Sequence, residues 1–330
     1  LYSDTNYNTP YIFPDVMPSR NVTLYAWWVR TTDIIDYYLY EKVDYDGGVE
    51  NAIRIIDITR AAIYLSNMLV PAEIEGLPVK YIGYDTPYDD IISQQAKDEH
   101  TVFSSSSLKN VFIANTVENI GAMAFSAASE LSTIRFERDS QLTKISDAAF
   151  MNCSRIEQIS LPSSLQTIGD YVFADNRDVG GRDMMLSYVD IKHDSQLVNI
   201  GQRAFSGCSR LHSFFIPASL HSIDYKSFEG ASISQFTVAS NHEYYTDNNG
   251  VIFSLDNETL IYFPNRGGIS RGTDVFGNLI YEYVIPMTTR FIGQNAFRGN
   301  SHLTNVAVTT MVTSIGDYAF HNCSGLTKVC

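Results

Sequence analysis

The stretch LPSSLQTIGDYVF, residues 161–173, decides the fold, because the Ile and the Phe near its end recur at the same spacing along the chain. Pairs with an Ile five positions before a Phe occur seven times, at Ile120/Phe125, Ile145/Phe150, Ile168/Phe173, Ile200/Phe205, Ile223/Phe228, Ile292/Phe297 and Ile315/Phe320. Successive Phe residues lie 25, 23, 32, 23, 69 and 23 positions apart, which gives a unit of 23 residues with insertions. A recurring period of this length is the mark of a repeat array.

Each unit opens with an apolar pattern that predicts a short β-strand. One apolar residue is followed three and five positions later by two more, as at Leu108, Val111 and Ile113. The same pattern occurs at residues 131–136, 156–161, 211–216 and 303–308. Because side chains alternate between the two faces of a strand, the last two apolar residues point inward and the residue between them points outward.

One unit has too little apolar surface to bury its own face, so we expect the units to stack as coils around a continuous core. Successive opening strands then form a parallel sheet on one side of the stack. The repeat Ile and Phe become core columns, and the Gly that often follows the Ile is interpreted as a tight backbone turn. The expected fold class is a repeat solenoid, mostly β, with short turns or helical segments.

The opening strand and the Ile-Gly-x-x-Ala-Phe-x-x-Cys pattern together resemble the BspA-like leucine-rich repeat, which is found in surface proteins of bacteria and protists. The resemblance covers about residues 50–330, and residues 161–173 are close to the family's repeat. It implies a right-handed solenoid with a parallel sheet on one face. It also implies a non-enzymatic adhesion or recognition role, at the cell surface or in secreted form.

Three segments are predicted along the chain. Residues 1–30 contain MPSRNVTLYAWW, which resembles the closing strand of a Listeria–Bacteroides repeat, with an ordinary strand as the alternative. Residues 31–82 are expected to cap the solenoid, and residues 83–330 to form the repeats. A β-hairpin insertion is expected around residues 241–265, because Asn249-Gly250 is a favoured tight-turn pair between two apolar runs.

The charge balance argues against one class of ligand. Lys and Arg number 23 against 37 Asp and Glu, which gives a net charge of −14. This is the wrong sign for a phosphate backbone or an anionic membrane, so we expect no nucleic-acid partner and no direct membrane insertion. The chain starts at Leu1, and a new unit begins at Gly325, so both ends are expected to be cut from a longer precursor.

Three of the four cysteines occupy the same place in their units. Cys153, Cys208 and Cys323 each stand three positions after the repeat Phe. Cys153 and Cys208 are two coils apart, about 10 Å at the usual strand spacing, whereas a disulfide needs Cα atoms within about 7 Å. The column is therefore predicted to consist of buried thiols, and Cys330 to be an exposed free thiol.

The sequence contains no pattern that predicts catalysis or a bound cofactor. The seven His residues show no metal-ligand spacing, and no nucleophile elbow, phosphate loop or dinucleotide motif is present. We therefore expect no catalytic residue, no metal site and no cofactor. The acidic stretches at 175–183 and 84–100 are interpreted as solvated loops, with calcium binding at the first and partner contact at the second as alternatives.

The candidate ligand-binding site is the outward column of the predicted strands, because a solenoid presents this column as one extended strip. Its residues are Phe112, Arg135, Ser160, Asp190, Phe215, Thr237, Val284 and Ala307. Outward-facing aromatics near an Arg are typical of binding surfaces, with cover by a neighbouring module or loop as the alternative. The expected partner is a host or matrix protein or a glycan, bound by a monomer. The alternative function is a structural spacer that displays other domains.

Overall fold

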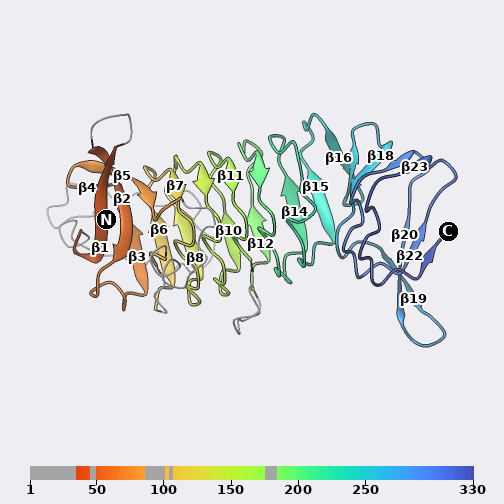
Figure 1. The fold of residues 1–330 in the computed structure, drawn as a ribbon, viewed down its shortest axis with the longest axis horizontal. Helices are drawn as coiled ribbons and strands as arrows, with labels where there is room; N and C mark the ends of the chain where they lie inside the picture. Colours follow the sequence, from red (N-terminus) through yellow and green to blue (C-terminus); the bar gives the residue numbers. More distant parts are fainter. Residues whose placement is uncertain (1–34, 45–49, 86–100, 104–106, 175–183) are drawn as a thin grey trace, which may run out of the picture.

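The computed structural model describes residues 35–44, 50–85, 101–103, 107–174 and 184–330. These residues form one elongated stack of coils, with the N-terminal coils at one end and the C-terminal coils at the other (Figure 1). Within these ranges the regular structure is β-strand, apart from one 3-10 turn at Ile35–Tyr37, and turns connect the strands. The predicted solenoid is therefore confirmed. Residues 1–30, for which part of a Listeria–Bacteroides repeat was predicted, lie outside the described residues.

The strands that open the repeat units follow one another along the stack and pair in parallel in three short sheets, which together we call the first ladder. They are β3 (Asn67–Val70), β6 (Asn110–Ile113), β8 (Thr133–Phe136), β10 (Gln158–Ser160), β12 (Tyr188–Asp190), β14 (Ser213–Ile216) and β15 (Gln235–Val238). The predicted alternation is present, since Val111 and Ile113 are buried and Phe112 between them is exposed. The apolar pattern of the sequence thus places β6, β8, β10 and β14 correctly, whereas β3 lies in the segment expected to be a cap and was not predicted.

A second parallel ladder, which the sequence did not predict, runs along another side of the stack. Its strands are β5 (Leu77–Ile82), β7 (Asn119–Ile120), β9 (Lys144–Ile145), β11 (Thr167–Ile168) and β13 (Asn199–Ile200). The repeat Ile is extended here, and the amide of the next residue bonds to the preceding coil, as in Gly169 N–H to Ile145 O at 2.8 Å. Two-residue strands are too short for a periodic pattern to reveal.

Antiparallel strands cover the N-terminal end of the second ladder. β1 (Tyr38–Asp44) pairs antiparallel with β2 (Glu50–Ile58), and β2 pairs parallel with β5. β4 (Glu73–Ile74) forms a short hairpin with the start of β5. The outermost strand, β1, carries alternating exposed and half-buried side chains after Tyr38, as suits a strand with one face in water.

The centre of the stack is a column of parallel Phe rings. Neighbouring ring centroids are 4.5 to 5.7 Å apart, and every ring is fully buried. The column members are Phe103, Phe125, Phe150, Phe173, Phe205 and Phe228. Phe103 lacks the Ile five positions earlier, so the sequence pattern missed it.

The turn around each repeat Phe adds a third set of hydrogen bonds between coils. The Phe125 amide donates to Ala149 O at 2.8 Å, and the Phe150 amide donates to Val172 O at 3.0 Å. The residue two positions before the Phe adopts a left-handed conformation in most coils, as at Ala148 with φ 55° and Tyr171 with φ 57°. The turns therefore pair between coils in a regular way, as the strands do.

The Gly after the repeat Ile has a role different from the predicted tight turn. Gly121, Gly169 and Gly201 are not among the residues with positive φ. A Cβ on Gly169 would instead lie 2.4 Å from Asp147 Oδ1 and 2.7 Å from the Asp147 amide of the preceding coil. Glycine is required here because the coils approach so closely that a side chain does not fit.

The predicted hairpin around 241–265 is confirmed, and it interrupts the stack. β16 (Tyr245–Asn248) and β17 (Val251–Ser254) pair antiparallel through a turn at Asn249-Gly250, with φ of 52° and 80°. β18 (Thr259–Tyr262) pairs with β17 and then, in parallel, with β21 (Phe291–Ile292). At this point Phe228 meets Phe236 edge-on at 68° instead of stacking on another repeat Phe.

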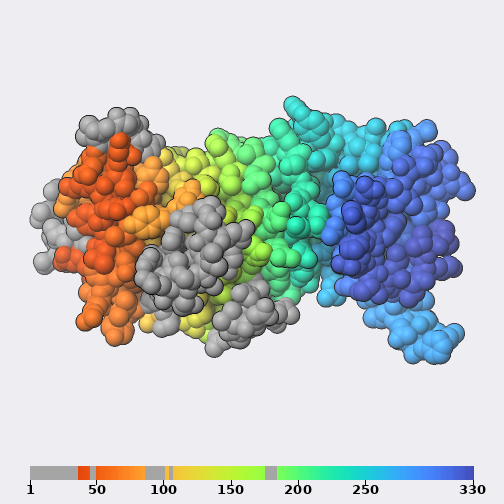
Figure 2. Space-filling model, viewed as in Figure 1, coloured from red at the N-terminus to blue at the C-terminus, as the bar shows by residue number. Residues whose placement is uncertain are grey.

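Regular stacking resumes after the interruption. Phe297 lies 4.8 Å from both Phe263 and Phe320, in a second core cluster. The coils there contain β22 (Asn305–Ala307), β23 (Ser314–Ile315) and β24 (Lys328–Val329). An unpredicted hairpin of β19 (Ile269–Thr273) and β20 (Leu279–Val284) projects from this part of the molecule (Figures 1 and 2), and β20 pairs with β22.

The cysteine column is confirmed as a set of core thiols. Cys153 and Cys208 are buried free thiols, Cys323 is half-buried and Cys330 is exposed. Each core thiol donates to the carbonyl oxygen of a repeat Phe in the preceding coil: Cys153 to Phe125 at 3.0 Å, Cys208 to Phe173 at 3.3 Å and Cys323 to Phe297 at 3.0 Å. A small side chain with a weak donor therefore satisfies a buried carbonyl between two coils.

We predict that Phe150→Ala lowers the free energy of unfolding by about 3–5 kcal/mol, because it opens a cavity in the ring column. Urea unfolding followed by circular dichroism measures the effect. Phe291→Ala is the matched control, since this ring is 43% exposed, and it should cost less than about 1 kcal/mol. Equal destabilisation by both substitutions would contradict the proposed role of the column.

Cysteine labelling provides a second test of the fold. Burial raises the pKa of the Cys153 thiol, so little reactive thiolate forms there. In the folded protein, iodoacetamide should label Cys330 quickly and leave Cys153 and Cys208 unmodified, whereas all four react in denaturant. Peptide mass spectrometry reads out the positions, and rapid native labelling of Cys153 would be inconsistent with the described core.

Candidate binding surface

The structure brings most of the predicted strip together on the first ladder. Phe112 pairs in register with Arg135, Ser160 with Asp190, and Phe215 with Thr237. These six residues lie on β6, β8, β10, β12, β14 and β15, which follow one another along the stack (Figure 1). We call these six residues the strand strip.

Val284 and Ala307 lie apart from the strand strip. They pair with each other on β20 and β22, in a separate sheet beyond the interruption. The six residues of the strand strip themselves lie in three short sheets, so Val284 and Ala307 differ from them in lying beyond the inserted hairpin. The hairpin insertion separates them, because it replaces the coils that a continuous ladder would need.

The two aromatic residues of the strand strip differ in exposure. Phe112 is 36% exposed, as predicted. Phe215 is only half-buried rather than fully outward-facing, because the His193 ring packs edge-on against it with centroids 5.0 Å apart. His193 belongs to the turn after β12, so the alternative that a neighbouring loop provides cover holds in part for Phe215.

Arg135 provides an available positive charge on the strand strip. It is exposed and lies in register beside Phe112. Among the residues that the structure describes, no carboxylate forms a salt bridge with it. A guanidinium next to an exposed ring is a common anchor in interfaces, because both groups form strong contacts with a partner.

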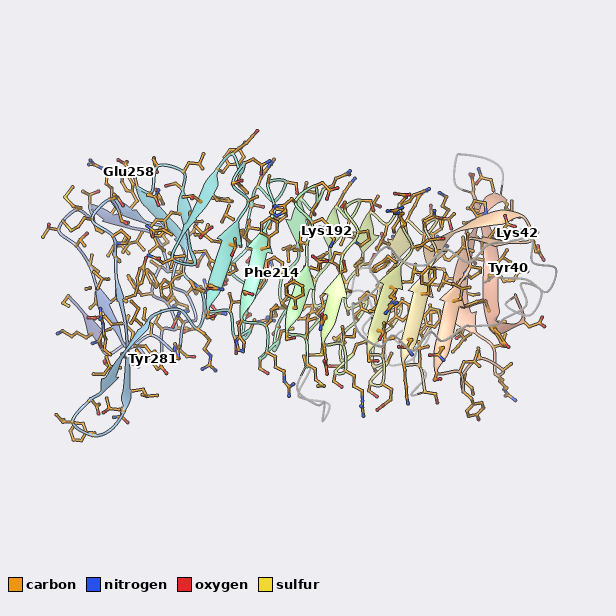
Figure 3. All side chains as sticks on the ribbon, turned by 180° about the vertical axis from the view of Figure 1, so that it is seen from behind. Tyr40, Lys42, Lys192, Phe214, Glu258 and Tyr281 are labelled. Carbon is orange, nitrogen blue, oxygen red and sulfur yellow. The ribbon has the colours of Figure 1, made fainter. Side chains whose placement is uncertain are left out.

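Asp190, in contrast, is engaged within the protein. Its Oδ2 accepts a hydrogen bond from Ser160 Oγ at 2.8 Å and forms an ion pair with Lys192, which lies near mid-length of the stack (Figure 3). Burial opposes ionisation of this carboxyl, but the Lys192 ammonium and the Ser160 hydroxyl together hold its pKa below its ordinary value. The group remains a neutralised pair rather than a free acidic anchor.

Sequence reasoning missed one aromatic on the same face. Tyr188 is 51% exposed and pairs with Gln158, one column from the strand strip. Side-chain alternation could have revealed it, because residues two positions apart on a strand share a face. Together with Phe112 it supplies a second exposed ring on this surface.

The projecting hairpin also carries apolar residues that were not predicted to be functional. Val275 and Phe276 at its tip are 93% and 85% exposed. The tip is ordered by Asp274, whose Oδ1 accepts hydrogen bonds from the Phe276 amide at 2.8 Å and the Asn278 amide at 2.9 Å. At the root, Tyr281 packs against His302 with centroids 3.7 Å apart (Figure 3).

Two further features bear on the chemistry of the described residues. Within the described ranges, no group of three or more His, Cys, Asp or Glu is placed to hold a metal ion. In that same part of the chain, no helix is long and apolar enough to cross a membrane. The acidic loop at 175–183 and most of the stretch at 84–100 lie outside the described residues, and their calcium and partner hypotheses stay predictions.

Comparison with known families identifies the repeat. Residues 98–180, 183–280 and 272–330 match the BspA type leucine rich repeat region, with six copies. The chain belongs to the BspA-type leucine-rich repeat family. The resemblance inferred from the Ile-Gly-x-x-Ala-Phe pattern is thereby confirmed. Comparison with curated proteins gives no significant match.

Solved structures show the same fold. The pneumococcal vaccine antigen PcpA superposes with a TM-score of 0.62 at 22% identity, over 88% of this chain and 67% of PcpA. A leucine rich cell surface protein from Faecalibacterium prausnitzii A2-165 gives a TM-score of 0.53 at 20% identity, over 94% and 77% of the two chains. At these identities the likeness establishes the leucine-rich repeat solenoid fold.

The hydrogen bond and ion pair of Asp190 predict that the stability difference between the wild type and Asp190→Asn depends on pH. Because its folded-state pKa is lowered, its contribution is present at neutral pH and is lost as the pH falls through that pKa. Asp190→Asn should cost less than about 1 kcal/mol at pH 7, and the difference from wild type should shrink in acid. Urea unfolding over a pH series measures this, and a difference that grows in acid would contradict it.

Proposed function

We propose that this chain is a non-enzymatic recognition module, displayed at the cell surface or secreted, which binds a host or matrix protein or a glycan. The bound ligand lies along the strand strip, and the module acts as a monomer. The single observation that carries the proposal is the exposed Phe112 ring in register beside the exposed Arg135, with the exposed Tyr188 ring on a later opening strand.

Family membership supports the general role. BspA-type repeats form solenoids, and one similar structure is that of a protein described as a cell surface protein. A solenoid offers a long continuous face, which suits large ligands better than small molecules. The net charge of −14 disfavours nucleic acid on this face, so protein and glycan are the ligand classes that fit.

The composition of the strand strip supports its use as the contact face. Exposed aromatics supply large apolar contact area at low entropic cost, and an unpaired Arg adds hydrogen-bonding and charge. The repeat Ile, Gly, Phe and Cys are explained by coil packing. The variable outward positions are therefore the ones available for recognition.

The test uses an immobilised panel of extracellular-matrix proteins and glycans, probed with the purified chain and its variants. Phe112→Ala with Phe215→Ala should weaken binding to any captured ligand by at least about tenfold, because two aromatic contacts are lost. Since Phe215 is half-buried, Phe112→Ala with Tyr188→Ala serves as a second variant that removes only exposed rings.

Phe291→Ala is the matched control, since it removes a ring of similar exposure from β21, which belongs to the sheet of β16, β17, β18 and β23. It should bind as wild type does. Unchanged binding by both strip variants would show that the strand strip is the wrong site. Absence of any ligand across the panel would favour the alternative function, a spacer that displays other domains.

A further inference from the structure

The interruption of the stack creates a cleft at the Phe turns, on residues distinct from the strand strip. In the preceding coil the Arg203 amide donates to Lys226 O of the next coil at 3.0 Å. The Lys226 amide instead donates to Asp224 Oδ1 at 2.8 Å, within its own turn. The regular turn-to-turn bonding therefore ends at Lys226, and space opens between this turn and the turn that contains Arg298.

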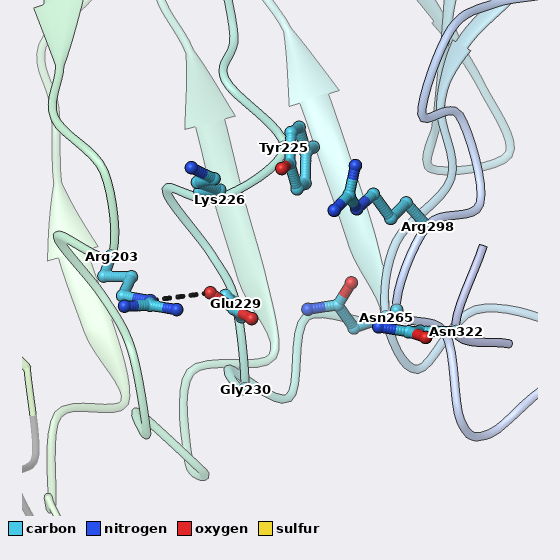
Figure 4. Close-up of a pocket in the computed structure, with 9 residues that line it drawn as sticks. Arg203, Tyr225, Lys226, Glu229, Gly230, Asn265, Arg298 and Asn322 are labelled. Carbon is cyan, nitrogen blue, oxygen red and sulfur yellow. Dashed lines mark hydrogen bonds and ion pairs between the residues drawn. The ribbon is translucent and has the colours of Figure 1, made fainter. Parts of the chain in front are cut away.

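This space is a cleft of about 140 Å³ that is open to solvent (Figure 4). Its main lining residues are Arg203, Tyr225, Lys226, Glu229, Asn265 and Arg298. Asn265 is fixed in place, because its Nδ2 donates to Phe228 O at 2.7 Å. The side chains come from coils on both sides of the interruption, so the cleft exists only in the assembled stack.

The cleft is positively charged in a strongly acidic protein. Its walls carry three cations and one carboxylate, and Glu229 is already paired with Arg203 at 2.7 Å. Within the part of the chain that the structure describes, neither Lys226 nor Arg298 has a carboxylate salt-bridge partner. Two positive charges are therefore available to a ligand.

Aromatic rings hold one of these charges in position. The Arg298 guanidinium lies 4.5 Å from the Tyr225 ring centroid and 5.3 Å from that of Tyr318. Arg298 Nη1 also donates to Asn295 Oδ1 at 3.1 Å. Lys226 Nζ donates a hydrogen bond to Gln202 Oε1 at 3.2 Å. Because this acceptor is neutral, the charge of the Lys226 ammonium is not compensated. The guanidinium is thus preorganised, which reduces the entropic cost of binding an anion.

We propose that this cleft binds an acidic saccharide through a sulfate or carboxylate group. A guanidinium and an ammonium together suit such an oxyanion, because charge-assisted hydrogen bonds are stronger than neutral ones. The Tyr225 side chain lines the cleft with an apolar body and a polar tip, and the Asn265 and Asn322 amides can bond to hydroxyl groups. At about 140 Å³ the cleft is smaller than the usual small-ligand site, so it holds the charged group and at most part of one sugar ring.

Isothermal titration calorimetry at physiological ionic strength tests the proposal with the whole chain. The probes are a heparin-derived oligosaccharide, a hyaluronan oligosaccharide, a neutral dextran oligosaccharide and inorganic sulfate. The wild type should bind at least one acidic saccharide and not the neutral one. The two acidic probes distinguish a sulfate requirement from recognition of carboxylate alone.

Lys226→Gln with Arg298→Gln should weaken that binding at least about tenfold, a change that corresponds to the loss of charge-assisted contacts. Lys226→Gln alone, which keeps Arg298 on Tyr225, should give a smaller loss. The matched control is Lys144→Gln with Arg290→Gln, which removes equal charge from exposed ion pairs elsewhere. Thermal unfolding of each variant verifies that the fold is retained.

Several outcomes would overturn the proposal. These are no binding of either acidic saccharide by the wild type, equal weakening by the control pair, or binding of inorganic sulfate as tight as that of the saccharide. Phe112→Ala with Tyr188→Ala should leave acidic-saccharide binding unchanged, so the cleft and the strand strip can fail independently.

Discussion

The structure depends on one constraint, the close and regular spacing of neighbouring coils. Two strand ladders and the Phe turns bond each coil to the next, and the Phe rings stack at 4.5 to 5.7 Å between centroids. Where glycine follows the repeat Ile, as at Gly169, a Cβ would clash with the preceding coil, whereas the coil of Ile145 accommodates Ser146 at this position. The small thiol of Cys153 fits between coils and donates to a Phe carbonyl for the same reason. The most regular positions of the sequence are therefore explained by packing.

The proposed recognition role falls to positions that packing does not fix. On the first ladder these positions carry Phe112, Arg135 and Tyr188, while Asp190 is neutralised by Lys192 within the protein. Neighbouring coils place such residues one strand spacing apart, which builds a continuous surface from residues more than twenty positions apart in the chain. The residue types of the outward column can therefore differ from coil to coil, whereas the core columns repeat the same residue types.

The hairpin insertion has consequences beyond its own residues. It ends the regular turn bonding at Lys226, separates Val284 from the strand strip, and divides the core into two main clusters. The space it leaves is lined by cations from both sides, and the coils that follow support a second hairpin with Val275 and Phe276 exposed at its tip. A solenoid gains distinct surface features where its repetition is broken.

The sequence by itself determined the coil unit, the opening strands, the cysteine column and the first hairpin, because each depends on local patterns: apolar spacing, a recurring Ile and Phe, and Asn249-Gly250. Only the tertiary structure decided the second ladder, the contact role of Gly169 and the partial cover of Phe215 by His193. It also decided the placement of Arg298 on Tyr225. These features depend on distances between residues in different coils or turns, and a pattern read along one chain does not contain such distances.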